Sequence, residues 1–251
     1  RQEREDWLQQ QQDKRLRRGF SMSNQVHCRR PVRNLTLTGC FAAVLGGLIL
    51  FLCLVCVSVT VTLNFRPLYY LDMKLLHISD SSGYSNDVIR KNFDVLIRYN
   101  NIWHTGILNF PDFPMSESGR IHFEEVKDIF IFMQIFSIAA VILLVLWIVA
   151  WVKKKSLSFK WMKFTGIVIA IIASTCGCAL IIDGYLAFTA MHTIFFRNDY
   201  WIFDATTDPV IRILPEEFFM HCGIMIIILA LIQIIILQLV YRRLKHGGNK
   251  I

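Results

Sequence analysis

Four long apolar stretches separated by polar segments dominate the pattern of this chain. They cover about residues 37–63, 129–152, 164–188 and 218–240. A helix needs about 20 consecutive apolar residues to cross about 30 Å of hydrocarbon, because it rises about 1.5 Å per residue. The pattern therefore predicts an all-α polytopic membrane protein with four transmembrane helices.

The polar segments 64–128 and 189–217 carry helical patterns of their own. After a capping cluster at residues 85–87, apolar residues recur at helical spacing up to Ile97. Residues 121–126 are expected to continue as a helix into the second span. We expect these two segments to form a mainly helical cap on one side of the membrane.

The basic residues are shared unevenly between the connecting segments. Residues 1–34 hold nine Lys/Arg against four acids, the 153–163 connection holds five Lys, and the end after Val240 holds four basic residues. These segments together carry +14, whereas the rest of the chain carries −6. By the positive-inside rule, both termini are cytoplasmic and the helical cap is extracytoplasmic. Because topology accounts for the basic excess, no nucleic-acid partner is expected.

This distribution divides the chain into three parts. Residues 1–34 are expected to be a basic cytoplasmic tail, residues 35–243 a single membrane domain, and residues 244–251 a short cytoplasmic end. Hydrophobic residues make up 54% of the chain and the mean hydropathy is positive, as membrane proteins require. None of the seven cysteines lies in the two segments of the cap. We therefore expect the cap to be held by packing without disulfides, and to offer no thiol nucleophile.

Two histidines are the first candidates for chemistry on the cap side. His122 precedes the second span by about two turns, and His192 follows the third span, so both belong to the same leaflet. An imidazole has an unperturbed pKa of about 6.5, and two of them can serve as a general acid/base pair. Glu125 lies three residues from His122 on one helix face, and Asp128 lies at the membrane boundary. The alternative is that both rings only bond interfacial groups.

Other chemistries have weaker support in the residues. Two histidines with Glu125, Asp199 or Asp208 could bind zinc, but the chain has no HExxH motif and no cysteine pair in the cap segments. A serine hydrolase would need a nucleophile elbow, and no G-x-S-x-G sequence occurs. We therefore expect no metal and no cofactor, and we keep a metal-dependent lipid hydrolase as an alternative.

Four sequence blocks resemble the bacterial integral-membrane family that contains the lipoprotein intramolecular transacylase. The blocks are residues 65–70 (FRPLYY), 92–100 (NFDVLIRYN), 116–130 (SESGRIHFEEVKDIF) and 191–219 (MHTIFFRNDYWIFDATTDPVIRILPEEFF). Together with the four spans they cover nearly everything after Leu35, whereas the tail is not covered.

The resemblance implies an acyltransferase that needs no cofactor. Such an enzyme moves an acyl chain from the diacylglyceryl group of a lipoprotein to the α-amino group of the same lipidated N-terminal cysteine, giving a lyso-form lipoprotein. The resemblance also implies a location in the cell membrane of a Gram-positive bacterium, with the active site on the extracytoplasmic side. Its partners would be the diacylglyceryl lipoprotein and membrane lipids. Two histidines are held to be essential in the family, and the matching blocks place them at His122 and His192.

The neighbourhood of these histidines offers candidates for supporting roles. Orienting or oxyanion-stabilising groups are expected among Glu125, Asp128, Arg120, Asn198, Asp199 and Tyr200, by position in the sequence. The candidates for contact with lipid or substrate are Trp201, Phe195 and Phe196. These aromatic residues also fit an interfacial belt, which anchors a protein without any chemistry. The alternative function is thus a non-enzymatic tetraspan module that binds lipid or protein.

Overall fold

The computed structural model describes residues 37–154 and 182–247, together with residues 9, 10, 12, 14, 171, 172, 174, 175, 177 and 178. Within these residues the secondary structure is helical and contains no strand, which confirms the all-α class. The chain divides into two units, Arg1–Cys40 and Phe41–Ile251. Apart from residues 37–40 at the start of the first long helix, the features that follow belong to the second unit. The expected tail falls almost entirely outside the described residues.

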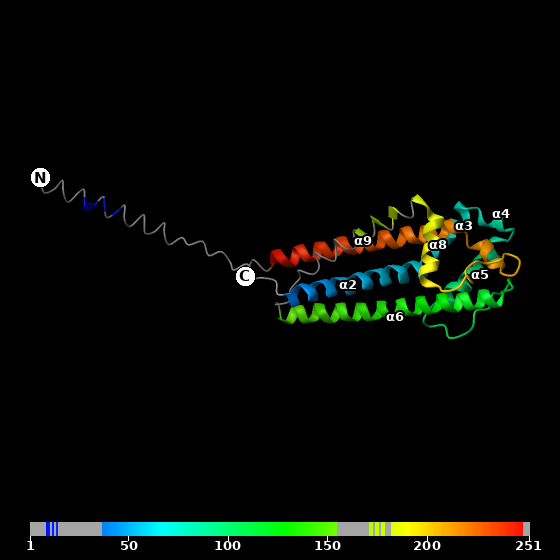
Figure 1. Ribbon diagram of the computed structural model, residues 1–251, viewed down its shortest axis with the longest axis horizontal. Helices are drawn as coiled ribbons and strands as arrows, with labels where there is room; N and C mark the ends of the chain where they lie inside the picture. Colours follow the sequence, from blue (N-terminus) through cyan, green and yellow to red (C-terminus); the bar gives the residue numbers. More distant parts are fainter. Residues whose placement is uncertain are drawn as a thin grey trace. The chain divides into compact units, whose positions relative to one another are not determined.

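Three long helices run side by side in this unit (Figure 1). They are α2 (Leu37–Asn64), α6 (Glu117–Lys154) and α9 (Glu216–Gly247). Two of them contain segments long and apolar enough to cross a membrane, Glu117–Leu146 and Glu216–Val240. The described residues thus contain two such helices, or three if α2 and the helix after it form one bent span.

Polar side chains join α2 to the other two long helices. The amide of Gln233 on α9 donates to the hydroxyl of Ser58 at 2.8 Å. The hydroxyl of Thr60 on α2 also lies 3.1 Å from the hydroxyl of Ser137 on α6, in a hydrogen bond. Most of the exposed side chains of these helices are aliphatic. Since lipid tails cannot form hydrogen bonds, these polar contacts favour the packing of α2 against α6 and α9.

The chain turns out of α2 at a proline. Helix α3 (Arg66–Leu75) begins with Pro67 in its first turn, and Phe65 before it has a non-helical conformation. Proline lacks the N–H that would continue the hydrogen bonds of the preceding helix, so α2 ends at Asn64. The axes of the two helices therefore meet at an angle of 57°.

The expected third span, residues 164–188, lies largely outside the described residues, and a helix break falls inside its range, at Asp183. Asp183 has an extended conformation and caps a separate helix, α8 (Gly184–Phe195), by accepting a hydrogen bond from the N–H of Leu186 at 2.9 Å. A carboxylate at this position satisfies a free N–H of the first turn. The apolar run of residues 164–188 conceals this break. Helix α8 lies crosswise to α9 (Figure 1).

The parts of the expected cap that lie outside α6, α8 and α9 are residues 66–116 and 196–215, and they gather where α6 and α9 begin (Figure 1). From here on, the cap means these residues alone. Their helices are α3, α4 (Ile78–Ser82), α5 (Asn86–Tyr99) and the 3-10 helix η1 (Pro209–Ile213). The side chain of Ser85 caps α5 by accepting from the N–H of Val88, as the capping cluster predicted.

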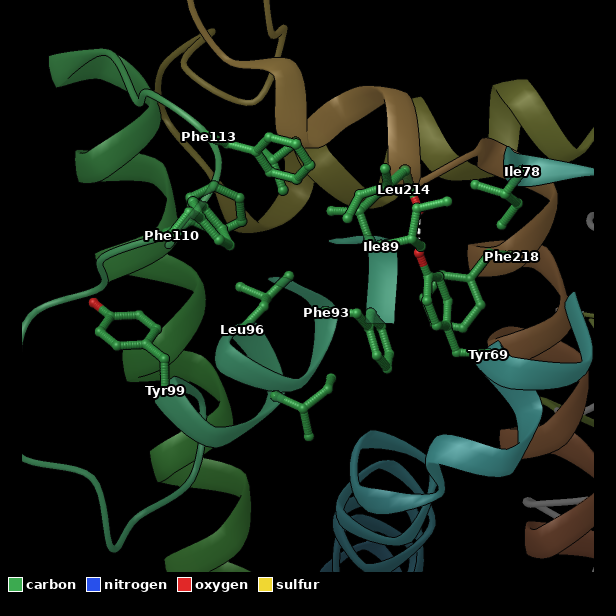
Figure 2. Close-up of a cluster of buried hydrophobic side chains, with 14 of the residues drawn as sticks. Tyr69, Ile78, Ile89, Phe93, Leu96, Tyr99, Phe110, Phe113, Leu214 and Phe218 are labelled. Atoms are coloured by element: carbon green, nitrogen blue, oxygen red, sulfur yellow. Dashed lines mark hydrogen bonds between the residues drawn. The ribbon is translucent and has the colours of Figure 1, made fainter. Parts of the chain in front are cut away.

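A cluster of buried aromatic and aliphatic side chains holds the cap together (Figure 2). Tyr69 lies at its centre with no exposed surface. Its ring stacks on Phe93 at a centroid distance of 3.6 Å and meets Phe218 edge-on at 5.0 Å. Its hydroxyl donates to the carbonyl of Ile213 at 2.6 Å. One side chain thus connects α3, α5, η1 and the first turn of α9.

Candidate functional site

His122 on α6 and His192 on α8 lie together beside the cap. Their ring centroids are 6.0 Å apart, and the planes are inclined by 33°. Only 4% of His122 and 8% of His192 is exposed. The pair therefore lies in an environment that excludes most water, where electrostatic interactions are stronger than at the surface.

Aromatic rings enclose both imidazoles. Phe196 contacts both, with centroid distances of 4.7 Å to His122 and 5.6 Å to His192. Phe203 meets the ring of His122 edge-on at 5.5 Å. Trp201 stacks on His192 at 4.8 Å. The phenylalanine rings and the face of Trp201 offer the imidazole nitrogens only weak hydrogen bonds, so this enclosure is mainly apolar.

A backbone hydrogen bond defines the state of His192. Its Nδ1 lies 2.8 Å from the carbonyl oxygen of Phe188, one turn earlier on α8. A carbonyl only accepts, so Nδ1 carries the hydrogen, and in the neutral ring Nε2 keeps a free lone pair. Burial lowers the pKa of His192 below its usual value, and the bond to the Phe188 carbonyl raises it by a smaller amount. His192 is therefore a neutral imidazole at pH 7 with Nε2 able to accept a proton.

Glu125 lies one helical turn beyond His122. Its Oε1 accepts a hydrogen bond from the side-chain amide of Asn198 at 2.9 Å. Among the described residues, neither its buried Oε2 nor the buried Nδ1 of His122 has a hydrogen-bond partner. Since a buried polar atom without a partner costs free energy, both atoms are suited to a ligand that supplies one.

A close approach between the cap and α6 positions Phe203. Gly119 lies on α6, one turn before the level of His122, and a Cβ built there would meet the carboxylate of Asp208 and the ring of Phe203. The Asp208 carboxylate accepts from the N–H of Ser116 at 2.7 Å, which ties the segment to the start of α6. Gly119 thus allows the ring of Phe203 to reach His122.

The other predicted site residues lie around this centre in different ways. Arg120 bonds to Glu117 and Glu124 of its own helix, so its guanidinium is directed to these carboxylates. Asp128 is exposed further along α6. The remaining residues belong to the segment after His192: Phe195, Asp199 and Tyr200 are exposed.

Sequence reasoning missed a buried contact between a histidine and an aspartate. Nδ1 of His221 on α9 lies 2.9 Å from Oδ1 of Asp72 on α3, and only 1% of Asp72 is exposed. The two residues are 149 positions apart, and no spacing rule connects them. The sequence places Phe188 only at the end of a predicted span, whereas its ring centroid lies 4.1 Å from that of His192.

The residues that could hold a metal do not converge in the part of the chain that the structure describes. No group of three or more His, Cys, Asp or Glu side chains there has an arrangement that fits a metal ion. The local chemistry of the site rests on two imidazoles, one carboxylate and one amide.

Comparisons with known proteins point to one family. Residues 44–219 match the family model described as lipoprotein intramolecular transacylase Lit. Among solved structures, the chain is similar to the membrane integral lipoprotein intramolecular transacylase Lit from Bacillus cereus. That match has 30% sequence identity and a TM-score of 0.76, and it covers 82% of this chain and 95% of that chain. Two variants of the B. cereus protein, with one histidine replaced by arginine or alanine, match at 30% identity with a TM-score of 0.70, covering 82% of this chain and 92% or 93% of theirs. No curated protein sequence gives a significant match.

Proposed function

The chain belongs to the lipoprotein intramolecular transacylase family, and we propose that it moves the sn-2 acyl chain of a diacylglyceryl lipoprotein onto the α-amino group of the same lipidated cysteine. The product is a lyso-form lipoprotein with one acyl chain on nitrogen and one on glycerol. The observation that supports the reaction at this site is the pair of buried imidazoles, His122 and His192, with ring centroids 6.0 Å apart.

The substrate supplies both the nucleophile and the acyl donor. The amine nitrogen attacks the ester carbonyl, a C–N bond forms, and the C–O bond to glycerol breaks. One amine proton must move to the departing glyceryl oxygen, so a shuttle is sufficient and no enzyme-bound acyl group is needed. Holding amine and ester in contact also supplies rate acceleration, because the step is intramolecular.

The proposed roles of the two histidines follow from their hydrogen bonds. His192 accepts the amine proton on Nε2, since its Nδ1 is bound to the carbonyl of Phe188. The same ring then returns the proton to the glyceryl oxygen. His122 donates a hydrogen bond from its neutral ring to the oxygen on which negative charge develops. Phe195, Phe196 and Trp201 would contact the acyl chains.

We place this chemistry on the extracytoplasmic side of a bacterial cell membrane. Four transmembrane helices with residues 1–34 and 244–251 in the cytoplasm would account for the distribution of Lys and Arg. Ser118 is exposed and lies one turn before His122 on α6, so a cysteine substituted there can test this orientation. A membrane-impermeant maleimide should label Ser118→Cys in intact cells, and labelling only after permeabilisation would reverse the orientation.

The product of the reaction provides the direct test. The protein is expressed in a host that accumulates diacylglyceryl lipoprotein, and a model lipoprotein is fragmented by tandem mass spectrometry. Intact mass cannot report the reaction, because an intramolecular transfer leaves it unchanged. We expect fragment ions of an N-acylated cysteine carrying a monoacylglyceryl thioether. If the cysteine keeps a free amine although the protein is abundant in the membrane, the proposal fails and a lipid-binding module becomes the better interpretation.

A further inference from the structure

We propose that Glu125 binds the α-ammonium group of the lipidated cysteine and holds it beside the two histidines. This inference rests on the proposed function and adds a recognition group for the attacking end of the substrate. In this proposal Glu125 contacts the substrate directly, whereas the sequence alone suggested that it orients the ring of His122.

The hydrogen bonds of the Glu125 carboxylate are incomplete. Oε1 accepts from Asn198 at 2.9 Å, whereas Oε2 is buried and has no partner among the described residues. An unpaired carboxylate oxygen away from water is costly unless a donor is bound there in the working state. The unsatisfied oxygen can therefore accept a hydrogen bond from a donor on a ligand.

Two independent connections place the Glu125 side chain on the side of α6 that carries His122. Glu125 follows His122 by three residues on α6, so the two side chains share a helix face. Asn198, which holds the carboxylate, follows Phe196 by two residues, and the ring of Phe196 contacts both imidazoles. The carboxylate is thus fixed from α6 and from the segment after α8.

The nearest basic side chains on α6 are engaged elsewhere. Arg120 bonds to Glu117 and Glu124. Lys127 donates to the carbonyl of His104 at 3.0 Å and lies 4.1 Å from the ring centre of Tyr99. Neither of these two cations pairs with Glu125, so the carboxylate is available for a cation from the substrate.

The α-ammonium group of the substrate matches this site in charge and hydrogen bonding. An α-amino group has a pKa of about 7.7–8.0, so most of it is protonated at pH 7 and carries three donors. Binding itself makes and breaks no covalent bond. Before attack, the ammonium loses one proton to solvent, which leaves a neutral amine that can still donate a hydrogen bond to the Glu125 carboxylate. The second proton follows the His192 route to the glyceryl oxygen.

Binding of two inert substrate analogues tests this role without any turnover. Both are lipopeptides with ether-linked glyceryl chains, which cannot transfer, and they carry either a free α-amine or an N-acetylated cysteine. We expect the wild type in nanodiscs to bind the free-amine probe about tenfold or more tightly, as for a hydrogen bond to a charged group. Glu125→Gln should lose this preference and still bind the N-acetyl probe with unchanged affinity, which also reports an intact fold.

Glu124→Gln is the matched control, because Glu124 neighbours Glu125 but pairs with Arg120. It should keep the wild-type preference. If the wild type lacks the preference, or Glu125→Gln retains it, the role of Glu125 is refuted even where the wild type transfers acyl chains. Absence of transfer by the wild type on the natural ester substrate would instead refute the proposed function.

Discussion

Replacing His192 with asparagine should slow acyl transfer by about 10²–10⁴-fold, which is the usual contribution of a positioned general base. Asparagine can keep the hydrogen bond to the Phe188 carbonyl through its side-chain amide, so the local structure of α8 is retained. It cannot accept a proton at neutral pH. The measurement is the rate of N-acylation of a model lipoprotein, followed by tandem mass spectrometry at equal amounts of membrane-inserted protein.

The control for this experiment is a histidine outside the site. His77 is exposed and has a left-handed backbone conformation with φ 49°, which asparagine tolerates better than most residues. His77→Asn should therefore transfer at the wild-type rate. Transfer by His192→Asn within about threefold of the wild type, well below the expected loss, would remove His192 from the chemistry.

The pH dependence of the wild-type rate tests the role of His192 as the base independently of any mutation. Burial lowers the pKa of His192, so Nε2 stays free of a proton to a lower pH than in an exposed histidine. Below about pH 8 the rate should fall in proportion to the neutral fraction of the substrate amine, whose pKa is about 7.7–8.0, and protonation of His192 should add a further decline only below about pH 6.5. A second acid limb centred near the ordinary histidine value of about 6.5, in addition to that of the amine, would contradict a buried, neutral base.

The long elements of the fold follow from the sequence because their signals are local. The length of the apolar runs predicts α6 and α9, and the capping cluster at Ser85 predicts α5. The helix break at Asp183 cannot be predicted from the length of the apolar run, because the run continues on both sides of this residue. What ends one helix and begins another there is the N-cap hydrogen bond of a single carboxylate.

The site was predictable only in part, for the same physical reason. The topology predicted from the apolar runs puts His122 and His192 at one depth, but their 6.0 Å separation depends on how α8 lies against α9 and the cap. Their catalytic roles stay a prediction. The contact between Asp72 and His221 joins α3 to α9 across 149 positions, and no local pattern encodes it. Burial is also a tertiary property, so the lowered pKa of His192 had no signal in the sequence.

The cap has no cysteine to cross-link it, and its order therefore depends on the buried cluster around Tyr69. A chain of ring contacts runs from this cluster to the site. Phe218 contacts Phe219 at 5.4 Å, Phe219 contacts Phe188 at 5.4 Å, and Phe188 contacts His192 at 4.1 Å. Loss of packing at Tyr69 should consequently loosen the support of His192 as well as the cap.

Tyr69→Ala should lower the free energy of unfolding by about 3–5 kcal/mol, because it removes a fully buried aromatic ring and leaves a cavity. Tyr69→Phe retains the stack on Phe93 and should cost about 1–3 kcal/mol, since only the carbonyl of Ile213 loses its donor. Tyr185→Ala is the control, because 66% of that residue is exposed.

These stabilities are measured in detergent by thermal unfolding and by protease cleavage within residues 66–116. The expected order of stability is wild type and Tyr185→Ala first, then Tyr69→Phe, then Tyr69→Ala. Tyr69→Phe should transfer acyl chains normally at low temperature, where the cap is folded, and lose activity at a lower temperature than the wild type. If Tyr69→Ala unfolds at the same temperature as the wild type, the buried cluster does not hold the cap together. In that case the ring contacts to Phe188 do not support His192 either.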